Sequence, residues 1–170
     1  MTGGLQDHRS PASAPGDEVE TLVVEGLRRW LAGYRTGSIE CWEMAWTLYA
    51  GRLGINRARH AVTGLSCFAR ALNGWAKCGL SLLPYDCPHR CAHECLAVAL
   101  VASWQRGDRE AAANIAEELV ISGGLPFTLE AAANFADTLR RLDLVLPDPA
   151  CLACRGPVPL ATHGATETRH

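Results

Sequence analysis

Apolar residues recur at alternating spacings of three and four between residues 55 and 79. The positions are Ile55, Ala58, Val62, Leu65, Ala69, Leu72, Ala76 and Gly79. This period places them in one stripe along an α-helix, the pattern of a packing seam in a helical bundle. Gly64 and Gly74 lie near the stripe and would allow a neighbouring helix to approach closely. The sequence therefore predicts a bundle in which this helix packs along much of its length.

Helical periodicity and capping residues mark further segments on both sides of this stretch. Asp17 and Glu20 resemble a capping box, and Asp108 and Thr128 are expected to cap the last two helices. The segment 39–51 carries large apolar side chains on more than one face, so we expect it to be central. Helices are predicted at about 17–34, 39–51, 88–107, 108–121 and 128–142.

The predicted fold class is all-α: a compact bundle of about six helices with a mobile N-terminal arm and an irregular, cysteine-containing C-terminal tail. Glycine and proline among small polar residues predict the arm. We expect a disordered arm at 1–16, a helical domain at 17–146, a cysteine-bearing turn packed on the bundle at 147–161 and a disordered tail at 162–170.

Composition narrows the class of function. Hydrophobic residues make up 48% and charged residues 20% of the 170 positions, as in globular proteins. The net charge of −2 predicts neither nucleic-acid nor membrane binding, and we interpret the locally basic middle of the chain as a solvated helix face. Neither a secretory signal nor a membrane span is apparent, so we expect a cytoplasmic protein. In that compartment eight cysteines indicate metal or redox chemistry, or burial, more than disulfides.

The most ordered cysteines are Cys87, Cys91 and Cys95, spaced by four residues with His89 and His93 between them. Pro88 favours a first helical turn, so the sequence predicts a helix with the thiols on one face and the imidazoles on the other. A thiol near the positive helix end should favour its thiolate form. Cys87 and Cys95 would stand about 12 Å apart on a regular helix, too far to share one tetrahedral ion.

A second cysteine pair, Cys151 and Cys154, is followed by Gly156 in a predicted tight turn. The pair resembles the knuckles of zinc ribbons and rubredoxin-like sites, in which backbone N–H groups point at the thiolates. Such a knuckle is half a site. We therefore expect Cys151 and Cys154 to join two ligands from Cys78, Cys87, Cys91 and Cys95 around zinc or an iron–sulfur cluster. The predicted function is a small cytoplasmic metal-binding accessory or regulatory protein, with no enzymatic activity and with a possible protein partner.

Two other interpretations stay open. The three-cysteine run also resembles four-helix copper-storage bundles, which implies Cu(I) sites with Cys41, Cys67 and Cys78 along the same lumen. Alternatively, the chain is a metal-free helical interaction module with buried, reduced cysteines. The sequence does not support thiol redox catalysis of the kind performed by helical alkylhydroperoxidase-type proteins, because this chain has no histidine at the matching position after Cys154.

Overall fold

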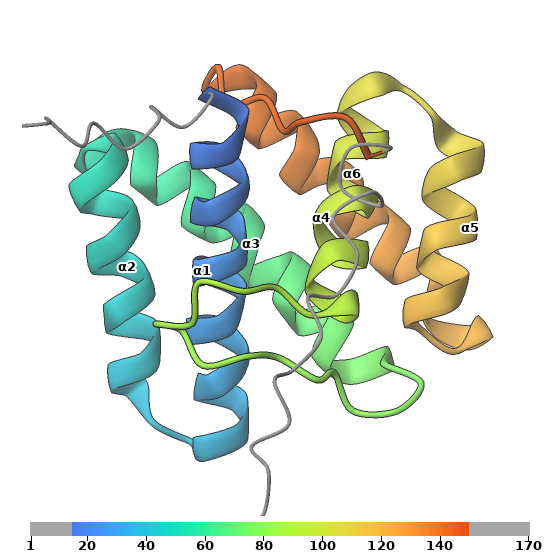
Figure 1. Ribbon diagram of the computed structural model, residues 1–170, viewed down its shortest axis with the longest axis horizontal. Helices are drawn as coiled ribbons and strands as arrows, with labels where there is room; N and C mark the ends of the chain where they lie inside the picture. Colours follow the sequence, from blue (N-terminus) through green and yellow to red (C-terminus); the bar gives the residue numbers. More distant parts are fainter. Residues whose placement is uncertain (1–14, 150–170) are drawn as a thin grey trace, which may run out of the picture.

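The computed structural model describes residues 15–149. These residues form an all-α bundle and contain no β-strand (Figure 1). The all-α bundle is confirmed for these residues, whereas the predicted mobile arm up to residue 14 and the predicted cysteine-containing tail from residue 150 lie outside them. The helices are α1 (Pro15–Thr36), α2 (Ile39–Leu53), α3 (Ile55–Trp75), α4 (Ala92–Arg106), α5 (Arg109–Leu119) and α6 (Leu125–Arg141), and the 3-10 turn η1 (Ser122–Gly124) precedes α6.

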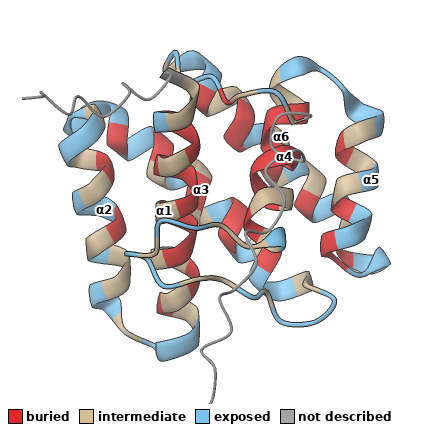
Figure 2. Ribbon diagram, viewed as in Figure 1, coloured by how far each residue is buried: buried red, intermediate tan, exposed pale blue. Residues whose placement is uncertain are grey.

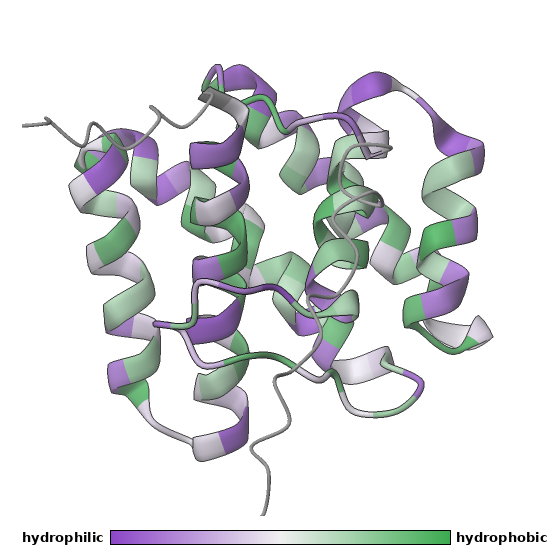
Figure 3. Ribbon diagram, in the orientation of Figure 1, coloured by the Kyte–Doolittle hydropathy of each residue, from purple (hydrophilic) through white to green (hydrophobic). Residues whose placement is uncertain are grey.

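The helices form two groups, α1 to α3 and α4 to α6, which contact each other through the pairs α3–α6 and α1–α4. The antiparallel helices α1 and α2 lie side by side, and α3 passes behind α1 to pack on α6, while α4 packs against α5 and α6 (Figure 1). Buried residues line the inward faces of these helices (Figure 2). Figure 3 colours the same view by hydropathy. Apolar and polar residues alternate along α5, as expected for a helix with one buried and one exposed face. None of the helices between residues 15 and 149 is both long enough and apolar enough to cross a bilayer.

The helix α2 lies at the edge of the bundle, so the prediction that it is central is wrong. Only Ala45 and Tyr49 are buried on it, and Ile39 is 64% exposed. The centre is occupied instead by α1 and by the second half of α4, from Ala97 to Ser103. Large apolar residues on several faces of α2 therefore do not all reach the core.

Several helix boundaries are set by a glycine or by a capping side chain at the boundary itself. Gly54 and Gly107 adopt positive φ, 79° and 76°, and separate consecutive helices. The Asp108 side chain accepts a hydrogen bond from the Ala111 N–H at 3.0 Å, which confirms the predicted cap. Thr128 does not cap α6, because that helix begins at Leu125 with proline in its first turn.

Close helix approach is confirmed at one of the two glycines on α3. A Cβ at Gly64 would lie 2.8 Å from Cδ2 of Phe135 on α6, whereas a Cβ at Gly74 would meet nothing within 4 Å. The missing side chain at Gly64 thus lets α3 and α6 pack against each other. Phe135 in turn stacks on Phe68, with ring centroids 6.0 Å apart.

The loop of residues 76–91 connects α3 to α4 and carries most of the cysteines of interest. It begins earlier than the apolar period predicts, because α3 ends where Trp75 and Lys77 pair with residues at the end of α5 and just after it. The Ile121 N–H donates to the Trp75 carbonyl at 2.9 Å, and the Lys77 N–H donates to the Leu119 carbonyl at 3.1 Å. From there the loop passes over α1 before α4 begins (Figure 1).

Candidate thiol site

The helix α4 begins at Ala92, with Cys91 as its N-cap, so the prediction of a helix from Pro88 is wrong. The reason is a long-range contact. The Arg28 side chain on α1 donates to the carbonyls of Cys87 at 2.6 Å and His89 at 2.5 Å, which are the groups that a helix would have used internally. The three thiols therefore do not share a helix face, and the expected 12 Å separation of Cys87 from Cys95 does not apply.

A buried ion pair between Arg28 and Glu94 fixes this loop on the bundle. The guanidinium donates to both carboxylate oxygens, at 2.7 and 2.8 Å, and the two side chains are 3% and 0% exposed. Glu94 also accepts hydrogen bonds from the N–H groups of Leu83 at 2.9 Å and Cys91 at 3.0 Å. The middle and the C-terminal end of the loop are thus tied to one carboxylate, which joins α1, the loop and α4.

The charge on Glu94 is stabilised despite its burial. Burial alone opposes ionisation, but hydrogen bonds from Arg28 and from the N–H groups of Cys91 and Leu83 outweigh it and lower the pKa of Glu94. For Arg28 the same balance holds, because Glu94 overcomes the effect of burial and raises the pKa of the guanidinium. The pair is therefore ionised at neutral pH.

A second ion pair seats the loop further along α1. Arg90 contacts Glu20 at 2.5 Å and donates to the Thr21 hydroxyl at 3.1 Å. Glu20 is fully buried. The prediction that Asp17 and Glu20 form a capping box is wrong, because α1 already begins at Pro15 and the Glu20 side chain contacts Arg90 instead. Sequence reasoning missed both ion pairs; the available signal was that Glu20 and Arg28 fall on the side of α1 that also carries buried Val24.

Cys91 has a closely defined environment at the start of α4. Its thiol donates to the Ser81 carbonyl at 2.9 Å, and its sulfur faces the Glu94 N–H in a capping box, in which the Cys91 N–H donates to the Glu94 carboxylate at 3.0 Å. The Ser81 N–H donates to Nδ1 of His93 at 3.1 Å, which brings the imidazole to the same part of the loop. Burial is the largest influence on the thiol and raises the pKa of Cys91, although the nearby backbone of Glu94 and His93 acts in the opposite direction.

The expected preference for the thiolate at the helix end is therefore not found at Cys91, the residue that caps α4. Cys91 is half-buried, and burial likewise raises the pKa of Cys95, although nearby Arg90 favours its thiolate. The positive helix end is too weak to overcome the loss of hydration at these positions. Any chemistry that needs a thiolate here must supply its own driving force, as a metal ion does.

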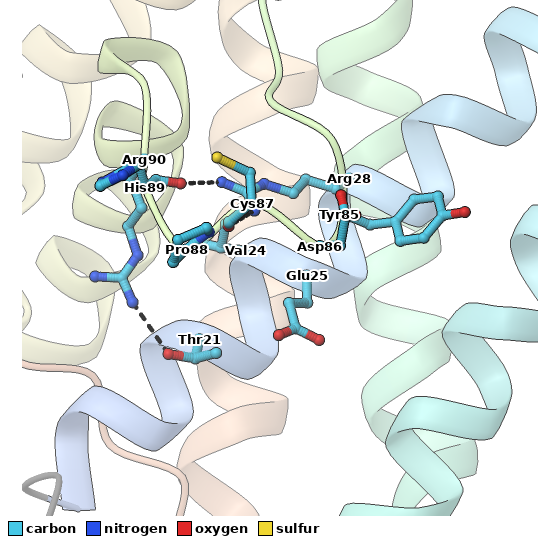
Figure 4. A pocket seen from close by; sticks show the side chains of 10 residues that line it. All are labelled: Thr21, Val24, Glu25, Arg28, Tyr85, Asp86, Cys87, Pro88, His89 and Arg90. Carbon is cyan, nitrogen blue, oxygen red and sulfur yellow. Dashed lines mark hydrogen bonds between the residues drawn. The ribbon is translucent and has the colours of Figure 1, made fainter. Parts of the chain in front are cut away.

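Cys87 lies in an open cleft of about 260 Å³ between α1 and the loop. Figure 4 shows its sulfur beside the Arg28 guanidinium and pointing away from α1. The cleft is lined by Thr21, Val24, Glu25, Arg28, Tyr85, Asp86, Cys87, Pro88, His89 and Arg90. Tyr85 is held at its edge by Arg29, whose guanidinium lies 5.2 Å from the ring centroid.

The remaining cysteines are spread over the chain. Cys78 is exposed on the loop, Cys67 is exposed on α3 and Cys41 is half-buried on α2. Cys151 and Cys154 lie outside the described residues. Within residues 15–149 the cysteines are free, and no three His, Cys, Asp or Glu side chains are grouped closely enough to hold a metal ion. The structure thus brings Cys91 and Cys95 to α4 and Cys87 to the adjoining loop without completing a metal site.

Comparison of the chain with protein-family models, with curated proteins and with solved structures finds no match. The chemistry of the site is therefore argued from the residues alone.

Proposed function

We propose that this chain is a small metal-binding accessory or regulatory protein without enzymatic activity, and that zinc or an iron–sulfur cluster is its cofactor. The observation that carries the proposal is the environment of Cys91. Its sulfur faces the backbone N–H of Glu94 in a capping box, and a backbone N–H aimed at sulfur is the arrangement that stabilises a coordinated thiolate in zinc knuckles. The surrounding loop is fixed by buried ion pairs, so a ligand here would be held in a defined position.

The other ligands come from cysteines near Cys91 and from Cys151 and Cys154, which we call the distal pair. Cys78, Cys87 and Cys95 flank it on the loop and on α4, and two of these four positions, with Cys151 and Cys154, would complete a tetrathiolate. The described residues alone hold no group of three, so the proposal requires the distal pair.

A metal site shared by Cys91 and the distal pair also requires the segment 144–149 to move. At about 1.5 Å per residue, the two ends of α4 are roughly 22 Å apart, and Cys91 lies at one end. Pro147 and Asp148 lie at the other end, where Arg106 contacts both. The step from Pro149 to Cys151 spans at most about 7 Å. Metal binding by Cys91 and Cys151 together would therefore release this segment from α4.

A metal-free interaction module is the second candidate, and one observation favours it. The Cys91 thiol donates to the Ser81 carbonyl, so it already has a structural role as a protonated side chain. In this alternative the cysteines only pack and cap, and the exposed surface of the bundle binds a protein partner. The Cu(I) alternative is less well supported, because Cys67 and Cys78 are exposed and do not line a common lumen.

The proposal also places the protein in the cytoplasm, where thiols stay reduced and available to a metal. A protein partner is the expected recipient or regulator of such a site. We propose no role in binding nucleic acid.

Metal content of protein purified without oxygen tests the proposal. We expect about one zinc per chain, or iron with acid-labile sulfide, and loss of that metal in the Cys91→Ser and Cys151→Ser/Cys154→Ser variants. Cys67→Ser is the matched control, because Cys67 is exposed on α3 and should leave the metal content unchanged. Protein without metal, with every thiol titratable, would contradict the proposal and support the interaction module. Several Cu(I) ions per chain would support copper storage.

A further inference from the structure

A long stretch of the chain has no carboxylate side chain. Residues 44–85 contain no Asp or Glu, although the protein as a whole has 18 acidic and 16 basic residues. The cationic residues in the stretch are Arg52, Arg57, Arg59, Arg70 and Lys77, and all are exposed. The whole of α3 lies inside this stretch.

These cations are not neutralised within the fold. None of them forms an ion pair with another residue between 15 and 149. Only Arg57 is engaged, through a hydrogen bond to the Leu142 carbonyl at the end of α6. On α1 and α6, by contrast, some surface charges pair within the helix: Glu25 pairs with Arg29, and Asp137 pairs with Arg140.

The spare charges on α3 share a stripe with an exposed apolar residue. At about 100° per residue, Ile55, Arg59, Thr63 and Arg70 fall within one face roughly 80° wide. Ile55 is 63% exposed, and the positions between the two arginines on this face are the small residues Thr63 and Ser66. Arg59 and Arg70 stand about 16 Å apart along the helix axis.

We propose that this stripe, Ile55–Arg59–Thr63–Arg70, is an interaction surface for an acidic, amphipathic segment of a partner protein. Charge complementarity identifies the partner: two unpaired guanidiniums separated by small side chains fit carboxylates spaced along an extended or helical segment. Ile55 supplies an apolar contact that a polyanion such as a nucleic acid would not use. The surface is independent of the proposed metal site, because none of its residues lies on the loop or on α4.

Fluorescence anisotropy with three labelled probes tests the proposal on the full-length protein. The probes are a synthetic amphipathic peptide of glutamate and leucine, a poly-glutamate peptide of equal length and a short DNA duplex. We expect the amphipathic peptide to bind best, with an affinity that falls as salt is raised. The Arg59→Glu/Arg70→Glu variant should bind it at least about tenfold more weakly. Ile55→Ser should weaken the amphipathic peptide and leave poly-glutamate unchanged.

The matched control is Arg35→Glu/Arg141→Glu, which changes the net charge equally at exposed positions on α1 and α6. It should leave peptide binding within about twofold of the unmodified protein. An equal loss in this control would overturn the proposal, since only net charge would then matter. Tighter binding of the DNA duplex would overturn it in favour of a nucleic-acid surface, and binding of no probe would identify α3 as an ordinary solvated helix.

Discussion

Arg28 is a cation on the buried side of α1 whose hydrogen bonds reach both the loop and α4. Its side chain contacts Glu94 on α4 and the carbonyls of Pro84, Cys87 and His89 on the loop. Each of these contacts joins residues more than fifty positions apart in the sequence. A local pattern can place Arg28 on the buried side of α1 but cannot identify its distant partners, so the sequence indicated the cysteines of this region but not the ion pair that positions them.

Removal of the negative charge from this ion pair should strongly destabilise the protein. Glu94→Gln leaves Arg28 buried without a counter-charge, and we expect the free energy of unfolding in urea to fall by about 3–5 kcal/mol. Glu25→Gln is the control, because its partner Arg29 is part of an ion pair near the surface. That change should cost less than about 1 kcal/mol. Similar losses in the two variants would show that the buried pair has no special role.

The same carboxylate predicts how stability depends on pH. Glu94 has a lower pKa in the folded protein than its ordinary value of 4.5. Its contribution is fully present above that ordinary value, where the carboxylate is ionised in both states, and is lost as the pH falls toward the folded pKa. Unfolding free energies should therefore decrease below about pH 4.5, and less steeply in Glu94→Gln than in the unmodified protein. Identical slopes for the two proteins would contradict this assignment.

At the scale of helices and loops, the sequence predicted those helix positions and boundaries that depend on neighbouring residues in the chain. The spacing of apolar residues located α3, and Asp108 and Gly107 marked the boundary between α4 and α5 correctly. The sequence did not predict where α3 ends or where α4 begins. Those boundaries depend on Ile121 pairing with Trp75 and on Arg28 binding the loop carbonyls, which are contacts between distant residues.

Two glycines on α3 offer a matched test of how this helix packs. In Gly64→Ala the new Cβ would collide with the buried ring of Phe135, so we expect the unfolding free energy to fall by about 1–3 kcal/mol. In Gly74→Ala the new Cβ meets nothing within 4 Å. Alanine should therefore stabilise the protein there by about 0.5–1 kcal/mol through its higher helix propensity. A stabilised Gly64→Ala variant would contradict the close approach of α3 and α6.

At the scale of the whole molecule, the all-α bundle followed from the sequence, whereas the metal site stays a prediction. Buried apolar faces specify how the helices pack, but they do not determine whether two distant cysteine pairs meet. The described residues place Cys91 at one end of α4 and the end of the segment 144–149 at the other. Their meeting depends on the energy of metal binding.

Metal binding should therefore stabilise the folded protein. A ligand that binds only the folded state at about one hundred times its dissociation constant adds roughly 2.7 kcal/mol, so the melting temperature should fall by several degrees after chelation. Differential scanning calorimetry of metal-loaded and chelated protein measures the shift. The Cys91→Ser variant should show the lower melting temperature with or without metal. An unchanged melting temperature in the unmodified protein would exclude a structural metal.

The most direct test of the central claim is cysteine alkylation measured by mass spectrometry, with and without metal. We predict that metal protects Cys91, Cys151 and Cys154 together, with one further cysteine from the loop or α4, and leaves the alkylation rates of Cys41 and Cys67 unchanged. Equal alkylation of Cys91 and of the distal pair in both states would contradict the account, because these thiols would then not share an ion.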